Sequence, residues 1–259
     1  MTTSPAVQHA FPWAGQLPEM VRNYPQLRFM GSKFRLLPWI HQVVSQLDFD
    51  TVLDAFCGSA CVGYLLKAMG KEVTSNDFLN FTATIARATV ENPGITLGPE
   101  EVSRLQADNR RHPHFIEQTF SEIFFAPDDL RFLDRVWSNL GSLKDPYKRY
   151  HFLEGLSCYW NGLEILQDSV VKKIRKPYTP FSYRKSALDA FDKMFQHFSR
   201  SIIVLSYSSN GYPDLDVLTN CMKRYKRSVT VHEKPHRYHF GTHEAAARNE
   251  VLEYLIVGR

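Results

Sequence analysis

The sequence has no long hydrophobic run, and we expect no secretion leader. No apolar stretch reaches the roughly 18 residues that are needed to cross a bilayer, and residues 1–20 lack a basic start followed by an apolar segment. Internal repeats and low-complexity tracts are also absent. These absences argue against a membrane protein or a repeat array, so we expect a soluble, cytoplasmic protein with no membrane partner.

Few residues are spaced as metal ligands. The cysteines include one CxxxC pair, Cys57 and Cys61, but no second pair that would complete a tetrahedral zinc site. Residues 236–243 (HRYHFGTH) contain three histidines, yet no fourth ligand has a matching spacing. We therefore expect no metal, and we expect reduced cysteines that pack in the core.

The chain does contain a regular alternation of strand and helix patterns. With 259 residues and 44% hydrophobic content, it is long enough to bury a full core. Short apolar runs predict strands, several of them buried on both faces, at residues 51–56, 72–75, 201–207, 228–233 and 253–257. Strands that alternate with helices predict an α/β fold with a mostly parallel sheet.

Helical periodicity is strongest in three segments. They are residues 60–69, followed by the C-cap residue Gly70, and residues 128–140 and 184–198. Between about residues 81 and 200 the pattern offers helices and proline-containing loops but no convincing buried strand. The sheet is therefore either interrupted by an insert or shortened in this region.

Positive charge is concentrated in the C-terminal half. Residues 1–140 carry 12 Lys/Arg and 15 Asp/Glu, whereas residues 141–259 carry 19 and 12. Clusters at 172–176 and 223–227 suit a polyanion, because each phosphate that Lys or Arg neutralises releases condensed counterions. A solvated helix face is the alternative interpretation of these clusters.

The segment from Val52 to Asp77 resembles half of a nucleotide site. An apolar strand runs into Cys57-Gly58-Ser59-Ala60, then a helix, then a second strand that ends at Asn76-Asp77. Asp77 closes the second strand of this unit, and an acid in that position can accept hydrogen bonds from ribose hydroxyls. The turn is not GxGxxG, so a nucleoside without a pyrophosphate fits better than a dinucleotide. A tight turn with no ligand remains the alternative.

Four motifs in order resemble one family. They are LRFMGSKFRLLPWI (residues 27–40), DAFCGSACVG (54–63), SNDF (75–78) and IIVLSYSSNGYP (202–213). This series is similar to the D12-class adenine-specific DNA methyltransferases, the Dam-like group. The resemblance implies a Rossmann-like methyltransferase fold, S-adenosylmethionine as cofactor, double-stranded DNA as substrate and methylation of adenine N6.

The resemblance also implies which residues line the cofactor pocket. Gly31 and Lys33 belong to the N-terminal motif that closes over the methionine end of the cofactor, where a compact ammonium suits a carboxylate. Asp54, Phe56 and Gly58 line the turn after the first strand. Asp77 holds the ribose. For Lys33, a solvated residue at the start of a helix is the alternative.

One family motif is missing. Members grip the flipped adenine with an Asp-Pro-Pro-Tyr tetrad, and this sequence contains none. The nearest match, Asp145-Pro146-Tyr147, lacks one proline and follows an amphipathic helix rather than an apolar strand. We expect Asp145 to begin a loop or helix, and we interpret the gap as an internal deletion with its junction near Arg149 and Tyr150.

Further DNA contacts are expected near the carboxyl end of the 201–207 strand and in the loop at residues 236–243. The resemblance implies that Ser206, Tyr207 and Asn210 face the target base. An ordinary turn is the alternative interpretation of the dipeptide Asn210-Gly211. In the loop, Arg237 suits a phosphate and Tyr238 suits a stacked base.

The expected organisation divides the chain into a core and an insert. Residues 1–80 and 200–259 form the methyltransferase core, and residues 81–199 form a helical remnant of the DNA-recognition insert. Three hypotheses follow: an active enzyme in which Asp145 and Tyr147 replace the tetrad, an inactive member that retains cofactor or DNA binding, and a binding module unrelated to methyl transfer. A restriction endonuclease or a chain that supplies the missing strand is the expected protein partner.

Overall fold

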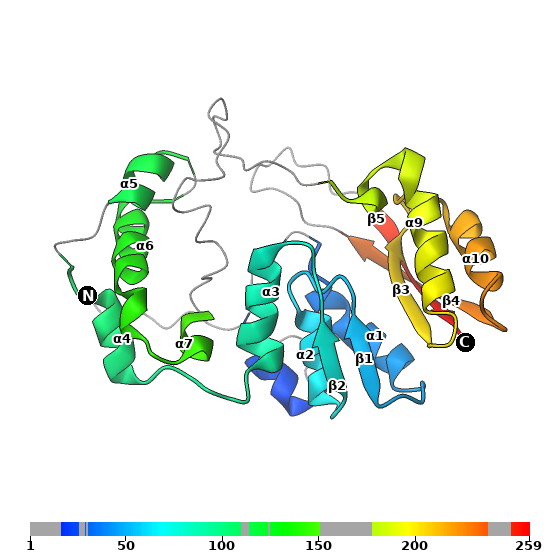
Figure 1. Cartoon of the computed structure of the whole chain (residues 1–259), viewed down its shortest axis with the longest axis horizontal. Helices are drawn as coiled ribbons and strands as arrows, with labels where there is room; N and C mark the ends of the chain where they lie inside the picture. Colours follow the sequence, from blue (N-terminus) through cyan, green and yellow to red (C-terminus); the bar gives the residue numbers. More distant parts are fainter. Residues whose placement is uncertain are drawn as a thin grey trace. The chain divides into compact units, whose positions relative to one another are not determined.

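The chain folds into two compact units, residues 1–175 and 176–259. The structure, a computed structural model, describes residues 17–25, 29, 31–109, 114–123, 125–150, 178–237 and 250–259 (Figure 1). Within the described residues, the sheet strands of each unit pair only with one another. Each unit is therefore described by itself.

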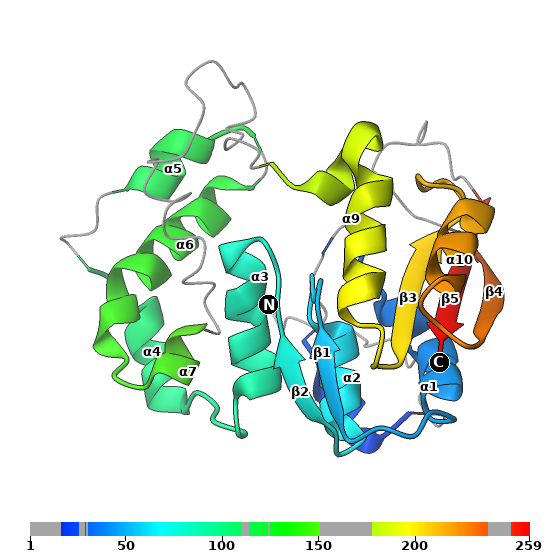
Figure 2. The same ribbon diagram turned by 45° about the vertical axis from the view of Figure 1, so that its right-hand side comes forward.

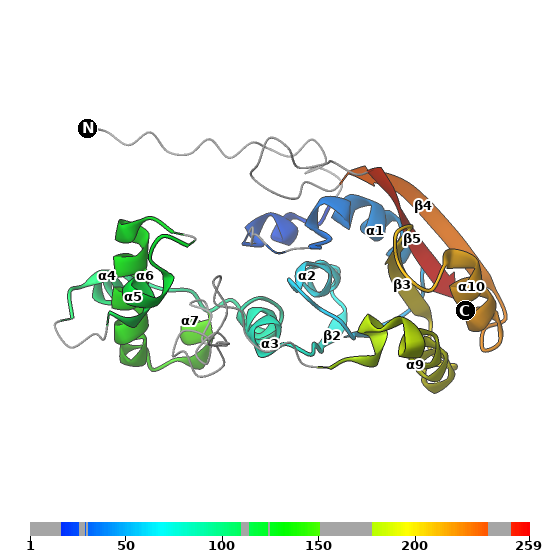
Figure 3. The same cartoon turned by 90° about the horizontal axis from the view of Figure 1, so that it is seen from above.

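The first unit contains a parallel strand pair joined by a helix. Strand β1 (Thr51–Asp54) pairs in parallel with β2 (Glu72–Ser75), and α2 (Cys61–Ala68) connects them. Figure 3 shows α2 nearly end-on beside β2. The helix ends before Gly70, whose φ of 77° terminates it. The predicted strand–helix–strand unit is confirmed.

One face of this strand pair is exposed, so β1 and β2 are not among the strands buried on both faces. Side chains alternate along β1, and Leu53 is 44% exposed. The same alternation occurs along β2, where Glu72 and Thr74 are exposed. Helix α2 contributes the fully buried Leu65. An apolar run thus identified the strand, but it did not show that only one face of the pair would be covered.

Short helices surround this pair. Before it lie η2 (Glu19–Asn23), η3 (Phe34–Leu36) and α1 (Leu37–Val44), and after it lie α3 (Asn80–Ala86) and the π-helical turn η4 (Arg87–Glu91). Pro38 fits the first turn of α1, where its missing N–H costs no hydrogen bond. Leu36, Leu37 and Ile40 are buried and anchor this region to the core.

A helical segment completes the first unit. Its elements are α4 (Pro99–Gln106), α5 (Phe115–Phe120), α6 (Pro127–Asn139), η5 (Leu140–Ser142) and α7 (Pro146–Tyr150). Helix α6 confirms the helix predicted at 128–140. One buried cluster joins Ile116, Phe120 and Leu130, and a second joins Leu105, Leu140 and Leu143. Trp137 packs against both clusters, so α6 is the central helix of this segment.

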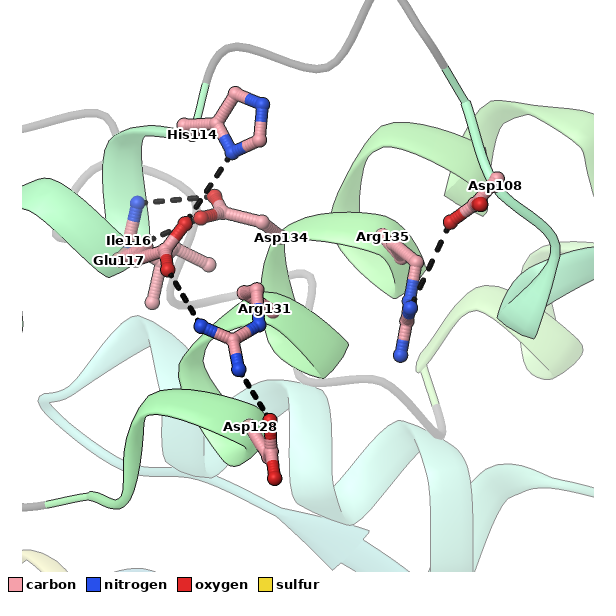
Figure 4. A network of polar contacts seen from close by, with 8 residues as sticks. All are labelled: Asp108, His114, Ile116, Glu117, Asp128, Arg131, Asp134 and Arg135. Atoms are coloured by element: carbon pink, nitrogen blue, oxygen red, sulfur yellow. Dashed lines mark hydrogen bonds and ion pairs between the residues drawn. The ribbon is translucent and has the colours of Figure 1, made fainter.

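A buried carboxylate fixes α5 against α6. Asp134 accepts hydrogen bonds from the backbone N–H groups of Ile116 and Glu117, both at 2.9 Å (Figure 4). These donors belong to the first turn of α5, so the carboxylate acts as its N-cap from another helix. Glu117 also bonds Arg131 at 3.0 Å. Ligating atoms of His114, Glu117 and Asp134 lie within 4.8 Å of one another, but hydrogen bonds within the protein already account for both carboxylates.

The second unit is an antiparallel sheet covered by two helices. It contains η7 (Pro180–Ser182), α9 (Arg184–His197), β3 (Ile203–Ser208), α10 (Leu215–Lys223), β4 (Val229–Arg237) and β5 (Glu250–Gly258). The strand order is β3-β5-β4, and β5 runs antiparallel to both neighbours. The expected α/β class is therefore confirmed, whereas parallel pairing in the described residues is confined to β1 and β2.

Aromatic and aliphatic side chains hold the helices on the sheet. Phe195 of α9, Met222 of α10 and Ile256 of β5 are buried in one cluster, so α9 and α10 cover the same face of the sheet (Figure 2). Cys221 lies in this cluster, and Cys57, Cys61 and Cys221 are all free and buried. In the described part of the chain, no helix is both long enough and apolar enough to span a membrane.

The basic cluster at 223–227 has two structural members. Arg224 forms an ion pair with Asp192 at 2.7 Å. Lys226 is buried, and its ammonium donates to the carbonyls of Phe198 at 2.7 Å and Ser199 at 2.9 Å and also to that of Ser201. These carbonyls follow the end of α9, so Lys226 fixes the segment that leaves this helix.

We expect Lys226→Met to destabilise the protein by about 2–4 kcal/mol, because it leaves several carbonyls without their donor. The measurement is urea unfolding followed by circular dichroism. Lys223→Met is the matched control, since Lys223 is exposed on the same stretch of chain, and it should change stability by less than about 0.5 kcal/mol. Equal effects of the two substitutions would contradict a structural role for Lys226.

Candidate functional site

The turn after β1 is tied to the end of β2. Gly58 has a φ of 51° and Ala60 a φ of 59°, so the chain twice adopts the left-handed conformation within the turn. The Gly58 N–H donates to Oδ2 of Asp77 at 2.8 Å, and the Cys57 N–H donates to the carbonyl of Asn76 at 2.9 Å. The sequence predicted a strand that ends at Asp77 and a turn that contains Gly58, and the structure brings these two residues into direct contact.

Asp77 bridges two backbone segments. Its second oxygen, Oδ1, accepts a hydrogen bond from the Leu79 N–H at 3.0 Å. Each carboxylate oxygen has two lone pairs, so both oxygens retain capacity for a further donor such as a hydroxyl group. Asp77 therefore shapes the turn and can still bind a ligand at the carboxyl ends of the two parallel strands.

The N-terminal motif lies against the same turn. The hydroxyls of Ser32 and Ser59 are 3.0 Å apart, and the Tyr24 hydroxyl donates to the carbonyl of Ser59. A side chain at Gly58 would place its Cβ 3.3 Å from the ring of Phe29. Segments far apart in the sequence thus converge on Gly58 and Ser59, as the ordered motifs predict.

Gly31 and Lys33 flank Ser32 in this segment. Gly31 is exposed and has a φ of 79°, with open space where a Cβ would lie, so backbone conformation rather than crowding favours glycine there. Lys33 is half-buried and precedes η3. Their connection to Ser32 places both residues beside the turn.

Two large rings are exposed next to this turn. Phe56 follows β1 and is 54% exposed, and Phe78 follows β2 and is 52% exposed. Rings of this size usually contribute to a core, so their exposure at the carboxyl ends of paired strands is typical of a surface that receives a ligand. Sequence reasoning selected Phe56 but missed Phe78, although its position directly after Asp77 was an available signal.

Asp54 lies under the turn rather than at its surface. Burial raises the pKa of its carboxyl to about 6, the Gly63 N–H lowers it by donating a hydrogen bond, and the charge of Asp77 raises it further. Its Oδ2 is buried without a hydrogen-bond partner in the described residues. A Cβ on Gly63 would lie 3.3 Å from this oxygen. The carboxyl therefore faces the first turn of α2.

Asp145 begins α7. Its Oδ1 accepts hydrogen bonds from the N–H groups of Tyr147 at 2.8 Å and Lys148 at 3.4 Å. Pro146 is the first residue of the helix, and the Tyr147 hydroxyl bonds Glu91 at 3.1 Å. The predicted helix start is confirmed, since α6 and η5 precede Asp145 instead of a strand.

The residues expected to face DNA lie in different environments. Tyr207 points toward the helix-covered face of the second-unit sheet, where it packs against Phe191, and its hydroxyl donates to the carbonyl of Pro213 at 2.8 Å. Burial raises its pKa to about 12. Ser206 alternates to the opposite face of β3. Asn210 is exposed in the loop that follows the strand.

The remaining two predictions concern the end of β4. Arg237 is the last residue of that strand and is exposed. Tyr238 lies outside the described residues, as does most of the histidine-containing segment at 236–243.

Residues 29–208 match the family of D12 class N6 adenine-specific DNA methyltransferases. The chain belongs to this family. The match includes the Gly58–Asp77 site and extends to the end of β3. Family membership identifies the reaction class as methylation of adenine N6 in DNA, and it implies a methyl donor. The hypothesis of a binding module unrelated to methyl transfer is therefore wrong.

A relative is similar to nearly the whole methyltransferase chain. The Type II methyltransferase M2.HphI of Haemophilus parahaemolyticus is 21% identical over 334 aligned residues, which cover 92% of this chain and 99% of the relative. The alignment is longer than the 259 residues of this chain, so the relative contains segments that have no counterpart here. No solved structure matches the chain.

Gly58→Ala should destabilise this methyltransferase more than Gly70→Ala. Both glycines have positive φ, so each alanine costs about 1 kcal/mol in backbone strain. Only at Gly58 does the new Cβ also press on Phe29; nothing lies within 4 Å of a Cβ at Gly70. Urea unfolding of both variants tests this. Equal losses of unfolding free energy in the two variants would show that the Phe29 ring can move aside at no energetic cost.

Asp54→Asn should stabilise the protein at neutral pH by about 1–3 kcal/mol, because it removes a buried charge. The folded pKa of about 6 exceeds the reference value of 3.8. Protonation of Asp54 therefore stabilises the fold at low pH, and this stabilisation is lost as the pH rises through about 6.

Urea unfolding of both proteins between pH 4 and pH 7 measures this effect as a difference that shrinks toward low pH. Asp48→Asn is the control for loss of an exposed carboxylate on the same unit. A difference that does not vary with pH would contradict a buried, ionised Asp54.

Proposed function

We propose that the chain binds S-adenosylmethionine in its first unit and that this unit serves the methylation of adenine N6 in double-stranded DNA. The observation that carries the proposal is the contact between Gly58 and Asp77, which joins the carboxyl ends of two parallel strands beside the exposed rings of Phe56 and Phe78. We infer that β1, α2 and β2 are the first part of a Rossmann-like methyltransferase sheet.

The residues beside the turn suit the parts of this cofactor. The remaining lone pairs of Asp77 can accept hydrogen bonds from the ribose hydroxyls, and the rings of Phe56 and Phe78 can contact the adenine. Lys33 can attract the methionine carboxylate from the N-terminal motif. Gly31 and Gly58 permit the two bends of the backbone that bring these segments together.

When bound, S-adenosylmethionine supplies a methyl group on a sulfonium sulfur. The contribution of this chain is positioning, because the turn holds its own backbone in place before any ligand arrives. Asp54 has a different task in this proposal. Since its carboxyl faces the first turn of α2, it supports the turn from below and does not contact the cofactor.

The adenine site requires a separate proposal. Gripping the exocyclic nitrogen requires a hydrogen-bond acceptor at the end of a strand, next to the cofactor. Asp145 is occupied as the cap of α7, which argues against such a role for Asp145, Pro146 and Tyr147 in this conformation. We propose that the tetrad was lost by an internal deletion near Arg149 and Tyr150; the length of the alignment with M2.HphI supports this.

The deletion explains the proposed organisation and partners. Residues 1–80 and 200–259 would form the methyltransferase core, and residues 81–199 would be the remnant of the recognition insert. A chain that supplies the missing strand would restore the adenine site. A restriction endonuclease is the other proposed partner, because the relative is named a Type II methyltransferase.

A second candidate function is cofactor binding without catalysis. The specific observation in its favour is the absence of Asp-Pro-Pro-Tyr from all 259 residues. The two candidates share the cofactor site and differ only in methyl transfer, so one set of proteins distinguishes them.

Calorimetric titration with S-adenosylmethionine tests the cofactor site. Asp77→Asn keeps the shape of the side chain but removes its charge, and it should weaken binding by about 10- to 100-fold. Asp145→Asn is the matched control and should bind as tightly as the wild type, because Asp145 caps a helix away from the turn. Wild-type affinity in Asp77→Asn would contradict the proposed ribose contact.

Transfer of a labelled methyl group to adenine in duplex DNA, measured with the same proteins, separates the two functions. Transfer by the wild type that is lost in Asp145→Asn would mean that Asp145 contacts adenine after all. Cofactor binding without transfer would establish the inactive alternative.

A further inference from the structure

The second unit exposes a group of tyrosines at the start of α9. Tyr178 is 63% exposed and Tyr183 is 47% exposed, and their rings stack with centroids 5.0 Å apart and an interplanar angle of 26°. Tyr212, which is 42% exposed, lies in the loop after β3, and the guanidinium of Arg184 is 5.0 Å from its ring centroid. We call Tyr178, Tyr183, Arg184, Lys185 and Tyr212 the tyrosine surface.

The core does not account for these rings. The cluster beneath them is formed by neighbouring residues such as Phe181 and Phe191, whose rings meet edge-on at 5.1 Å. Tyrosine has only two side-chain torsions, so a stacked pair presents a large flat area at a low cost in conformational entropy. A preformed aromatic platform of this kind is suited to stacking on another planar group.

The charge of the tyrosine surface differs from that of the helical segment in the first unit. There, Arg131 pairs with Glu117 and Lys148 pairs with Glu101, so carboxylates neutralise these cations. Arg184 and Lys185 are both exposed, and within the described residues neither has a carboxylate within ion-pair distance. Two adjacent cations beside stacked rings attract an anion that also carries planar groups.

Nucleic acid combines these two properties. Its phosphates attract Arg and Lys, and its bases stack on aromatic rings when they are not paired within a duplex. Arg184 can serve both purposes, because its guanidinium already lies over the ring of Tyr212 and its charge remains available to a phosphate. The loop that carries Tyr212 also carries Asn210, one of the residues expected to face DNA.

We propose that the tyrosine surface binds a DNA strand through unpaired bases, with Arg184 and Lys185 contacting the adjacent phosphates. This inference rests on the proposed function, which supplies DNA as the partner. Methylation of a base requires that it leave the duplex, so an enzyme of this class gains from a surface that holds a locally opened strand.

Fluorescence anisotropy with the intact protein tests the proposal. The probes are a labelled single-stranded oligonucleotide and the fully paired duplex of the same sequence. Tyr178→Ala and Tyr212→Ala should each weaken binding to the single strand by about 5- to 150-fold, which is the range for loss of one stacked base. Binding to the paired duplex should change much less, because its bases are not available to stack.

Two matched variants separate stacking from other effects. Tyr212→Phe keeps the ring and removes only the hydroxyl, so it should bind the single strand as the wild type does. Arg184→Gln should lower the slope of log affinity against log salt by about 0.7, as expected for one phosphate contact on a single strand. Lys193→Gln removes one charge from the same helix, where Lys193 is paired with Asp189, and should leave the slope unchanged.

Calorimetric titration of every variant with S-adenosylmethionine distinguishes failure of this inference from failure of the proposed function. Unchanged cofactor binding together with weakened single-strand binding supports the tyrosine surface. Wild-type DNA affinity in Tyr178→Ala and Tyr212→Ala overturns it and leaves the cofactor site intact. A wild-type protein that binds neither cofactor nor DNA overturns both.

Discussion

The hydrogen bond from the Gly58 N–H to the Asp77 carboxylate is the constraint on which the candidate site depends. It joins the turn after β1 to the end of β2, two segments that the intervening helix α2 separates in the chain. The N-terminal motif then packs on the same turn through Ser32 and Ser59. This one bond therefore lies at the point where three of the sequence motifs meet.

The sequence predicted these local units well, because their signals are local. Apolar runs identified β1 and β2, and Gly70 marked the end of α2. Asp145 was likewise expected to begin a loop or helix, since no apolar strand precedes it, and it begins α7. In each case a short stretch of residues contained both the pattern and its physical cause.

Other features depend on partners distant in the sequence, and these escaped prediction. One face of β1 is exposed because no other described segment packs on it. The residues of the strand itself do not encode which segments will pack on it. Lys226 looked like part of a basic cluster, but the three carbonyls after α9 make it a buried cap. The contacts of Tyr207 with the Pro213 carbonyl and the Phe191 ring likewise lay outside what its own stretch of sequence indicated.

The two sheets differ in how much of their apolar surface is buried, and they therefore differ in local stability. Strand β5 is central in its sheet, and Leu255, Ile256 and Val257 along it are almost completely buried. Strand β1 spans four residues and leaves Leu53 in water. Segments with few buried apolar contacts open at the lowest free energy. The β1–β2 pair therefore opens more readily than the antiparallel sheet. A bound ligand that contacts both β1 and β2 would raise the free energy of this local opening.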